Sequence, residues 1–259
     1  MEIVKIPTSY GGLEKTGSEK APDMIVETLE NGVWLNESEK KPVPKVSGIE
    51  FNDESSIKKI HEIISKGIKG KENSIFLGGD HSITYSTFKE FAKKNPNAGI
   101  ISFDAHPDVF ENFEDAVHED WLFHLIEEGI LKPEHAIIVG VRAASKEEIE
   151  YLRKKKIKYY PMKNIFGNVE GVCDAVMEMA RGFGSLYVSV DIDAVDPAFA
   201  PGTGYMEPCG MTSRELLYFL QRLKLLKNLK ALDIVEIIPD KDVNGMTVKL
   251  GAKILGEFL

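Results

Sequence analysis

Four short clusters of acidic and histidine residues each follow directly after an apolar run typical of a buried β-strand. In an open sheet of parallel strands, ligands bind beyond the carboxyl ends of the strands. We therefore expect the four clusters to converge on one crevice. They are Gly78-Gly79-Asp80-His81-Ser82, Asp104-Ala105-His106-Pro107-Asp108, Asp191-Ile192-Asp193-Ala194-Val195-Asp196-Pro197 and Glu236-Ile237-Ile238-Pro239-Asp240.

The residue types in three of these clusters indicate a site for divalent metal ions. Side chains at alternate positions of extended chain point the same way, so each Asp-x-His-x-Asp or Asp-x-Asp motif presents its ligands together. One ion cannot use six such ligands and keep an open position, but two ions can if carboxylates bridge them. Mixed carboxylate and imidazole ligands suit Mn²⁺ and exclude a thiolate zinc site. The candidate ligands are His81, Asp104, His106, Asp108, Asp191 and Asp193.

Each motif also has a simpler interpretation when it is taken alone. Gly78-Gly79 is typical of a turn, and Asp196-Pro197 belongs to a common class of turn formers. Their joint occurrence after apolar strands favours the metal site, because clustered ionisable groups beside buried strands are costly without a compensating partner. Two metal ions could share a water molecule and ionise it near neutral pH, which is the chemistry of metal-assisted hydrolysis.

The elements that must position these motifs alternate between strands and helices. This alternation predicts an α/β domain with a mainly parallel sheet, covered by helices on both faces. The expected strands are Glu2–Ile6, Ser74–Leu77, Gly99–Phe103, Ala136–Val141, Ile157–Tyr160, Ser185–Val190 and Leu229–Ile237. The expected helices are Pro22–Leu29, Glu54–Lys69, Tyr85–Lys94, Glu119–Glu128, Lys146–Lys155, Val169–Arg181, Ser213–Leu225 and Met246–Phe258.

Composition narrows the class of protein further. The 259 residues are 43% hydrophobic and 28% charged, as in ordinary globular proteins, and the stretch 36–52 looks like a surface excursion, so we expect one domain over residues 1–259. A net charge of −9 argues against a nucleic-acid-binding surface. Two cysteines make no disulfide framework, and no apolar run approaches a membrane span. We expect a cytoplasmic protein without nucleic-acid or membrane partners.

The motifs together resemble those of the ureohydrolases, which comprise arginase, agmatinase and relatives such as formimidoylglutamase. The resemblance implies a three-layer α/β/α sandwich with a parallel sheet, a homo-oligomer (trimer or hexamer), and two Mn²⁺ ions, with other divalent metals possible. It also implies that His81 and Asp108 bind one ion, His106 and Asp193 the other, and Asp104 and Asp191 bridge them. The matching segments are 78–82, 103–108, 189–197, 201–204 and 233–239, with a weaker match at 19–22.

Two further residues receive roles by the same resemblance. Glu236 matches a glutamate that grips the planar guanidinium of the substrate, and a carboxylate can pair with such a fork in two hydrogen bonds. His118 matches a histidine that delivers a proton to the leaving amine. This chain has His118-Glu119 where the family usually has His-Gly or His-Ala. His124 on the following helix is therefore the competing candidate.

The sequence departs from the arginase pattern where that enzyme binds the α-carboxylate of arginine. Phe110 replaces an asparagine, and 109–120 contains five acidic residues but no Lys or Arg. We therefore expect a small guanidino substrate, with agmatine or another cationic guanidine first, arginine second and formimidoylglutamate third. A metal-binding relative without catalytic turnover is the alternative that is not an enzyme. If a substrate carboxylate is bound after all, Arg142 is the first candidate to bind it.

Overall fold

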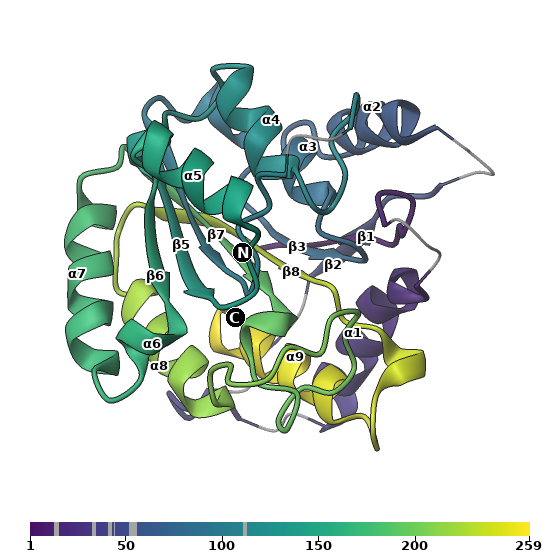
Figure 1. Ribbon diagram of the computed structural model, residues 1–259. Coiled ribbons are helices and arrows are strands. Elements are labelled where there is room, and N and C mark those ends of the chain that lie inside the picture. Colours follow the sequence, from purple (N-terminus) through teal and green to yellow (C-terminus); the bar gives the residue numbers. More distant parts are fainter. Residues whose placement is uncertain (13–15, 33–34, 41–42, 44, 52–55, 111–112) are drawn as a thin grey trace.

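The computed structural model describes residues 1–12, 16–32, 35–40, 43, 45–51, 56–110 and 113–259 (Figure 1). Its centre is a sheet of eight strands in the order β2-β1-β3-β8-β7-β4-β5-β6, and all neighbouring strands pair in parallel. The strands are β1 (Ile3–Ile6), β2 (Val46–Gly48), β3 (Ile75–Gly78), β4 (Ala98–Phe103), β5 (Ala136–Val141), β6 (Lys158–Pro161), β7 (Ser185–Asp191) and β8 (Leu229–Val235).

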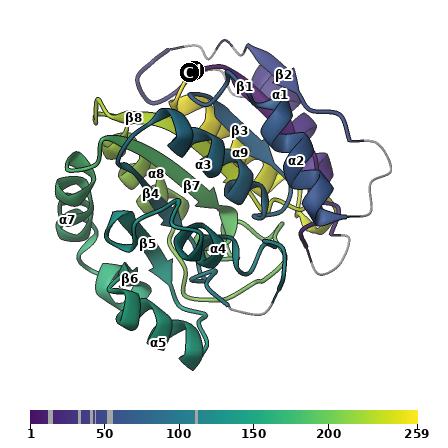
Figure 2. The same ribbon diagram turned by 90° about the horizontal axis from the view of Figure 1, so that it is seen from above.

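Helices cover both faces of the sheet, and each face has its own apolar core. Figure 1 shows α2, α3 and α4 above the sheet and α1, α8 and α9 below it. Figure 2 shows α2 to α5 lying over the upper face. The helices are α1 (Ala21–Gly32), α2 (Ile57–Gly67), α3 (Ile83–Lys94), α4 (Trp121–Glu127), α5 (Lys146–Lys155), α6 (Met162–Ile165), α7 (Val169–Arg181), α8 (Ser213–Leu223) and α9 (Met246–Glu257).

The two cores follow from the alternation of side chains along the strands. In β7, Leu186 and Val188 pack in one core with α7 and α8, whereas Tyr187 packs in the other core against α3. All seven side chains of this strand are buried. Since both faces are covered by helices, each central strand can be apolar throughout. The result is the predicted three-layer α/β/α sandwich.

The strands and helices agree with the expected ones to within a few residues. The structure adds β2 at one edge of the sheet, within the stretch predicted to be a surface excursion, and the four-residue helix α6. Both are too short for a periodic apolar pattern to reveal them. The first residues of the expected helix Glu54–Lys69, together with residues 41, 42, 44 and 52 of the excursion, lie outside the described residues.

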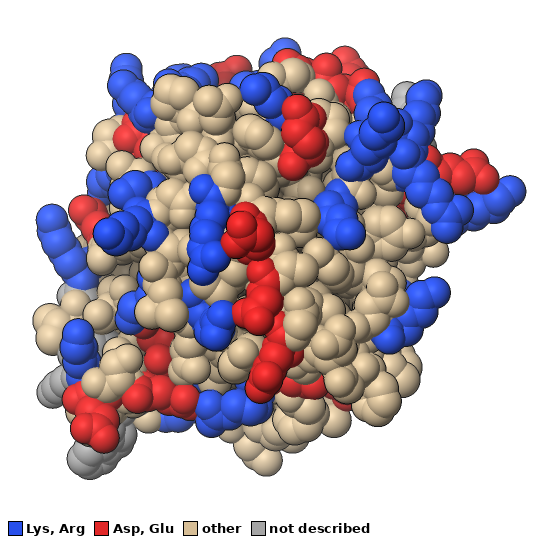
Figure 3. Space-filling view, turned by 90° about the vertical axis from the view of Figure 1, so that its left-hand side faces the viewer, with Lys and Arg blue, Asp and Glu red and all other residues tan. Residues whose placement is uncertain are grey.

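The surface on the side of β6 and α7 carries acidic and basic side chains interspersed with uncharged ones, and neither sign of charge covers it (Figure 3). None of the described helices combines the length and the apolar character that crossing a bilayer requires.

The start of α8 provides a test of local stability away from the clusters. The Thr212 hydroxyl accepts a hydrogen bond from the N–H of Glu215, whose carboxylate accepts one from the N–H of Thr212. Thr212→Ala removes one half of this capping box, so we expect the free energy of unfolding to fall by about 1 kcal/mol. Denaturant unfolding would measure it. Ser213→Ala changes the neighbouring residue, which takes no part in these two hydrogen bonds, and is the matched control. Equal losses of unfolding free energy in both variants would contradict the capping role.

Candidate functional site

The four clusters meet because the strands that precede them are the four central neighbours of the sheet. β3, β8, β7 and β4 lie side by side in that order, and they run in the same direction. Their carboxyl ends therefore form one continuous edge, as the sequence predicts. Gly79 needs to be glycine at this edge, because a Cβ there would lie 1.9 Å from the backbone oxygen of Thr8.

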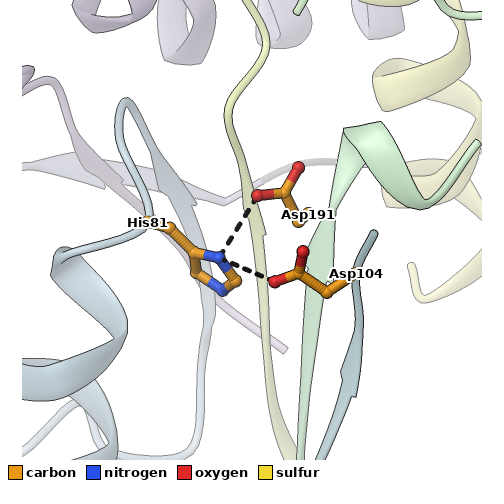
Figure 4. A group of neighbouring side chains, drawn as sticks. All are labelled: His81, Asp104 and Asp191. Carbon is orange, nitrogen blue, oxygen red and sulfur yellow. Dashed lines mark ion pairs between the residues drawn. The ribbon is translucent and has the colours of Figure 1, made fainter. Parts of the chain in front are cut away.

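The first group of side chains surrounds His81, which follows β3. Three carboxylate oxygens lie close to its Nδ1: Asp104 Oδ2 at 3.2 Å, Asp108 Oδ2 at 3.0 Å and Asp191 Oδ2 at 3.2 Å. The side chain of His81 is only 1% exposed, and Asp104 is equally buried. Figure 4 shows the carboxylates of Asp104 and Asp191 pointing toward the same ring nitrogen of His81. His81 Nδ1 nevertheless has no hydrogen-bond partner among the described residues.

The other nitrogen of His81 is fixed by a buried polar chain. Ser189 Oγ lies 2.6 Å from a carboxylate oxygen of Asp233 and 2.9 Å from His81 Nε2. Because a carboxylate can only accept, the single Ser189 hydroxyl hydrogen is donated to Asp233. Ser189 Oγ must then accept from His81 Nε2–H. Nδ1 is left as the nitrogen that can bind a cation, in the arrangement that outer hydrogen bonds impose on metal-binding histidines.

A second group overlaps the first through Asp104. His106 Nδ1 lies 3.5 Å from Asp104 Oδ1 and 3.0 Å from Asp193 Oδ2. Asp104 thus directs one carboxylate oxygen toward each histidine. His81, Asp104 and Asp191 could hold one ion, and Asp104, His106 and Asp193 another. The six predicted ligands therefore lie together. Asp104 belongs to both groups, whereas Asp191, to which the family resemblance also gave a bridging role, belongs only to the group around His81.

Backbone N–H groups orient the carboxylates before any ligand is bound. His106 N donates to Asp104 at 2.7 Å, Asp193 N donates to Asp191 at 2.8 Å, and Ala105 N donates to Asp193 at 3.0 Å. The backbone of Asp108 has a φ of 52°, in the left-handed region that non-glycine residues rarely occupy. Such strained positions cluster at functional sites.

The electrostatics of the group fit a cation. Burial and the charge of Asp104 raise the pKa of Asp108 to about 7. Burial, followed by the charges of Asp193 and Asp104, also raises the pKa of Asp191. Several buried carboxylates this close resist ionisation together, and a bound cation removes that penalty. Oxygen and imidazole donors without a thiolate suit a hard or borderline divalent ion such as Mn²⁺.

A cavity of about 220 Å³ opens above the two groups. Five of the six predicted ligands line it, all except Asp104, and so do His118 and Glu236. Glu236 directly follows β8 with a φ of 62°, and its carboxylate accepts a hydrogen bond from the backbone N–H of His81 at 2.7 Å. Its own backbone N–H donates to the oxygen of Gly79 after β3, and its side chain lines the cavity.

His118 lies against Glu236, with 3.4 Å between its Nδ1 and the Glu236 carboxylate. Burial disfavours the charged ring, but Glu236 outweighs that effect and raises the pKa of His118 to about 9. His118 Nε2 is buried without a hydrogen-bond partner in the described part of the chain. His118 therefore lines the cavity as an imidazole with a raised pKa, and a carboxylate oxygen of Glu119 lies 3.9 Å from its Nε2.

His124, the alternative proton donor, and Arg142, the candidate for binding a substrate carboxylate, lie outside the cavity lining. His124 Nε2 is 3.4 Å from Asp120, and the ring lines a separate basin between α2, α3 and α4. Arg142 donates hydrogen bonds to the backbone oxygens of Asp193, at 2.7 Å, and Glu207, at 2.8 Å. Its guanidinium thus ties two loops together, and it does not line the cavity.

Two residues beside the site have roles that the sequence motifs do not predict. Asp233 stands inside the apolar run Leu232 to Val235, where a carboxylate is itself a signal of a buried polar role. No motif of the sequence predicts a role for Tyr205, yet its ring packs edge-on against His106, 5.3 Å between centroids, and its hydroxyl donates to Glu119 at 3.2 Å.

Comparison with known proteins places the whole chain in one group of relatives. A family model described as the arginase family matches residues 1–259. A formimidoylglutamase from Halalkalibacterium halodurans is 30% identical over 275 residues, covering 99% of this chain and 85% of that protein. An agmatinase from Bacillus anthracis is 31% identical over 217 residues, covering 80% of this chain and 70% of that protein.

A solved structure of one of these kinds of enzyme has a similar fold. The crystal structure of formimidoylglutamase from Bacillus subtilis superposes with a TM-score of 0.92 at 26% identity, and the match covers 99% of this chain and 85% of that one. The arginase-like α/β/α fold predicted from the sequence is therefore confirmed.

The shared position of Asp104 generates a test by metal analysis. If the two groups each hold an ion, Asp104→Ala should lower the content of both ions together, whereas Asp193→Ala should mainly lower one. Metal content per chain after dialysis against limiting Mn²⁺, with the affinity of each site from titration calorimetry, would measure this. Full occupancy of both sites in Asp104→Ala would contradict the sharing.

Proposed function

Because the chain belongs to the arginase family, we propose that it is a hydrolase that uses two divalent ions, Mn²⁺ first among them, to release urea from a small guanidino compound. The observation that carries this proposal is the pair of overlapping groups His81–Asp104–Asp191 and Asp104–His106–Asp193 beneath a cavity that holds His118 and Glu236. When bound, two such ions supply Lewis acidity and lower the pKa of water.

Glu236 and His118 would orient the substrate and deliver a proton, respectively. Glu236 faces the cavity with a carboxylate that can pair with the N–H groups of a guanidinium and orient it. Hydrolysis forms a bond from a water oxygen to the guanidinium carbon and breaks the bond to the alkyl nitrogen. That nitrogen leaves as an amine and needs a proton, which His118 can deliver from Nε2.

The charges at the cavity mouth support a substrate with a cationic far end. Glu119 and Glu148 line the cavity beside Tyr205, and no described lining residue is Lys or Arg. A carboxylate on the substrate would be repelled there, and an amine would be attracted. Arg142, the candidate for binding a substrate carboxylate, does not line the cavity; its Nε and Nη2 donate to backbone oxygens, and its buried Nη1 has no partner among the described residues. We therefore propose agmatine or a similar amine-bearing guanidine as the favoured substrate and arginine as the next.

Formimidoylglutamate is the second candidate substrate class. It carries a related amidine group, and the relative from H. halodurans and the structure from B. subtilis are both named formimidoylglutamases. Its two carboxylates fit an acidic mouth poorly, which places it behind the amine-bearing guanidines. A metal-binding relative without catalytic turnover is disfavoured, because all six positions predicted to bind metal hold an aspartate or a histidine. The expectations of one domain, a trimer or hexamer, and a cytoplasmic location stay predictions.

A substrate panel tests the function and the substrate order together. With Mn²⁺ present, we expect kcat/KM to fall in the order agmatine, arginine, formimidoylglutamate. A partly exposed charge pair contributes up to ~1 kcal/mol, so agmatine should lead by about fivefold. Product release at low and high salt would measure it. The preference should shrink at high salt, since exposed charges are screened over ~10 Å at 0.1 M. A lead for formimidoylglutamate at both ionic strengths would reverse the substrate assignment.

The proton donor has a matched control within the chain. His118→Ala should lower kcat by about 10²-fold, the usual contribution of a general acid, while metal content stays unchanged. His124→Ala removes an imidazole six residues away that lies outside the cavity, and it should keep most of the activity. If His124→Ala showed the large loss and His118→Ala did not, the role would belong to His124.

A further inference from the structure

His61 is buried although it lies on a helix rich in Lys and Glu. It lies on α2 and is 8% exposed. Both ring nitrogens have close partners, with Nε2 2.7 Å from the backbone oxygen of Ala116 and Nδ1 2.8 Å from Ser86 Oγ on α3. The ring also packs edge-on against Tyr85, at 4.8 Å between centroids. Because both nitrogens of the ring are hydrogen-bonded, the ring fixes the positions of the groups that it bonds.

The hydrogens of this arrangement can be assigned from the partners. A backbone oxygen only accepts, so His61 Nε2 must carry the hydrogen that it donates to Ala116. Burial lowers the pKa of His61, so the ring is neutral and Nδ1 accepts from the Ser86 hydroxyl. Ser86 thereby selects the tautomer that donates to Ala116. The two bonds join three separate elements, namely α2, α3 and the segment that precedes α4.

That segment carries His118 only two residues after Ala116. Past the bond from His61, the chain is held by Val117 N, which donates to Asp120 at 2.7 Å, and by His118 N, which donates to the oxygen of Gly11 at 3.1 Å. Of these three contacts, the bond from His61 is the one that reaches the segment from the helix layer. It meets the segment on the side of the basin, whereas the His118 ring lines the catalytic cavity.

We propose that His61 is a positioning residue that anchors the backbone at Ala116 and thereby holds the His118 imidazole at its place over the cavity. This inference rests on the proposed role of His118. His61 does not touch the substrate or the ligand groups, so its effect is expected on the proton-delivery step. Misplacing a reacting group by about 1 Å can cost up to ~10²-fold in rate.

Substitutions that preserve one of the two hydrogen bonds distinguish a positioning role from a packing role. The amide nitrogen of Gln reaches about as far as a histidine Nε2 and can still donate to Ala116, whereas that of Asn reaches only as far as Nδ1. Phe fills the space without either bond. We expect kcat to fall on the order of 10-fold in His61→Phe and His61→Asn, with KM and metal content nearly unchanged, and to recover partly in His61→Gln. Ser86→Ala should give a smaller loss.

The control variant is His135→Phe. It removes another histidine bond to a backbone oxygen, from Nδ1 of His135, which precedes β5, to Ala98 at the start of β4, at 3.1 Å, and it should leave kcat unchanged. Amide hydrogen exchange gives a readout without turnover, because peptides covering residues 116–120 should exchange faster in His61→Phe than in His61→Gln.

The outcomes separate this proposal from the proposed function. Turnover by the wild type with an unchanged kcat in His61→Phe would overturn the positioning role and leave the function standing. Equal losses of kcat in all three His61 variants, matched by equal losses of stability, would assign His61 to packing alone. Absence of turnover from the wild type would overturn the function, and exchange at residues 116–120 would then decide whether His61 anchors the segment.

Discussion

Three carboxylate oxygens stand within 3.2 Å of one imidazole nitrogen in the interior of this protein, and that arrangement needs a cation. Burying one ionised carboxylate without a partner is costly, and burying several together adds their mutual repulsion. Two divalent ions would convert this repulsion into attraction. Metal binding and the integrity of this end of the sheet are therefore coupled, since without ions only two imidazoles and a few backbone N–H groups oppose the charge of the carboxylates.

The parallel sheet supplies the geometry that makes such a site possible. Four adjacent strands end at one edge, so residues more than a hundred positions apart in the sequence meet within hydrogen-bond distance. The buried chain from Asp233 through Ser189 to His81 then fixes the ring from behind. Asp233 accepts from the hydroxyls of Thr84, Tyr187 and Ser189, so its charge is satisfied deep in the core. A rigid second layer of this kind holds ligands in place before an ion arrives.

The proposed acid and part of the cavity lining stand on less regular chain, between β4 and α4 and beyond β7, whereas Glu236 follows β8 and Glu148 lies on α5. His118 and Glu119 follow one another on the first of these segments, and Tyr205 contacts them from the second. The proposed acid and Glu119 therefore share a contact with the same tyrosine. His61 bonds the same segment to α2, so the segment has contacts on the basin side as well as on the cavity side.

The strands and the ligand types can be predicted from the sequence alone, because apolar runs and Asp-x-His-x-Asp spacing are local properties of the chain. The same patterns place His81, Asp104 and Asp191 at strand ends and predict that these ends converge. Whether His118 or His124 lines the cavity depends on how α4 and the segment before it pack, and no local pattern encodes that packing. The burial of His61 and the hydrogen bonds of Arg142 depend on tertiary packing for the same reason. The partners of His61 lie 25 and 55 residues away, and those of Arg142 lie 51 and 65 residues away.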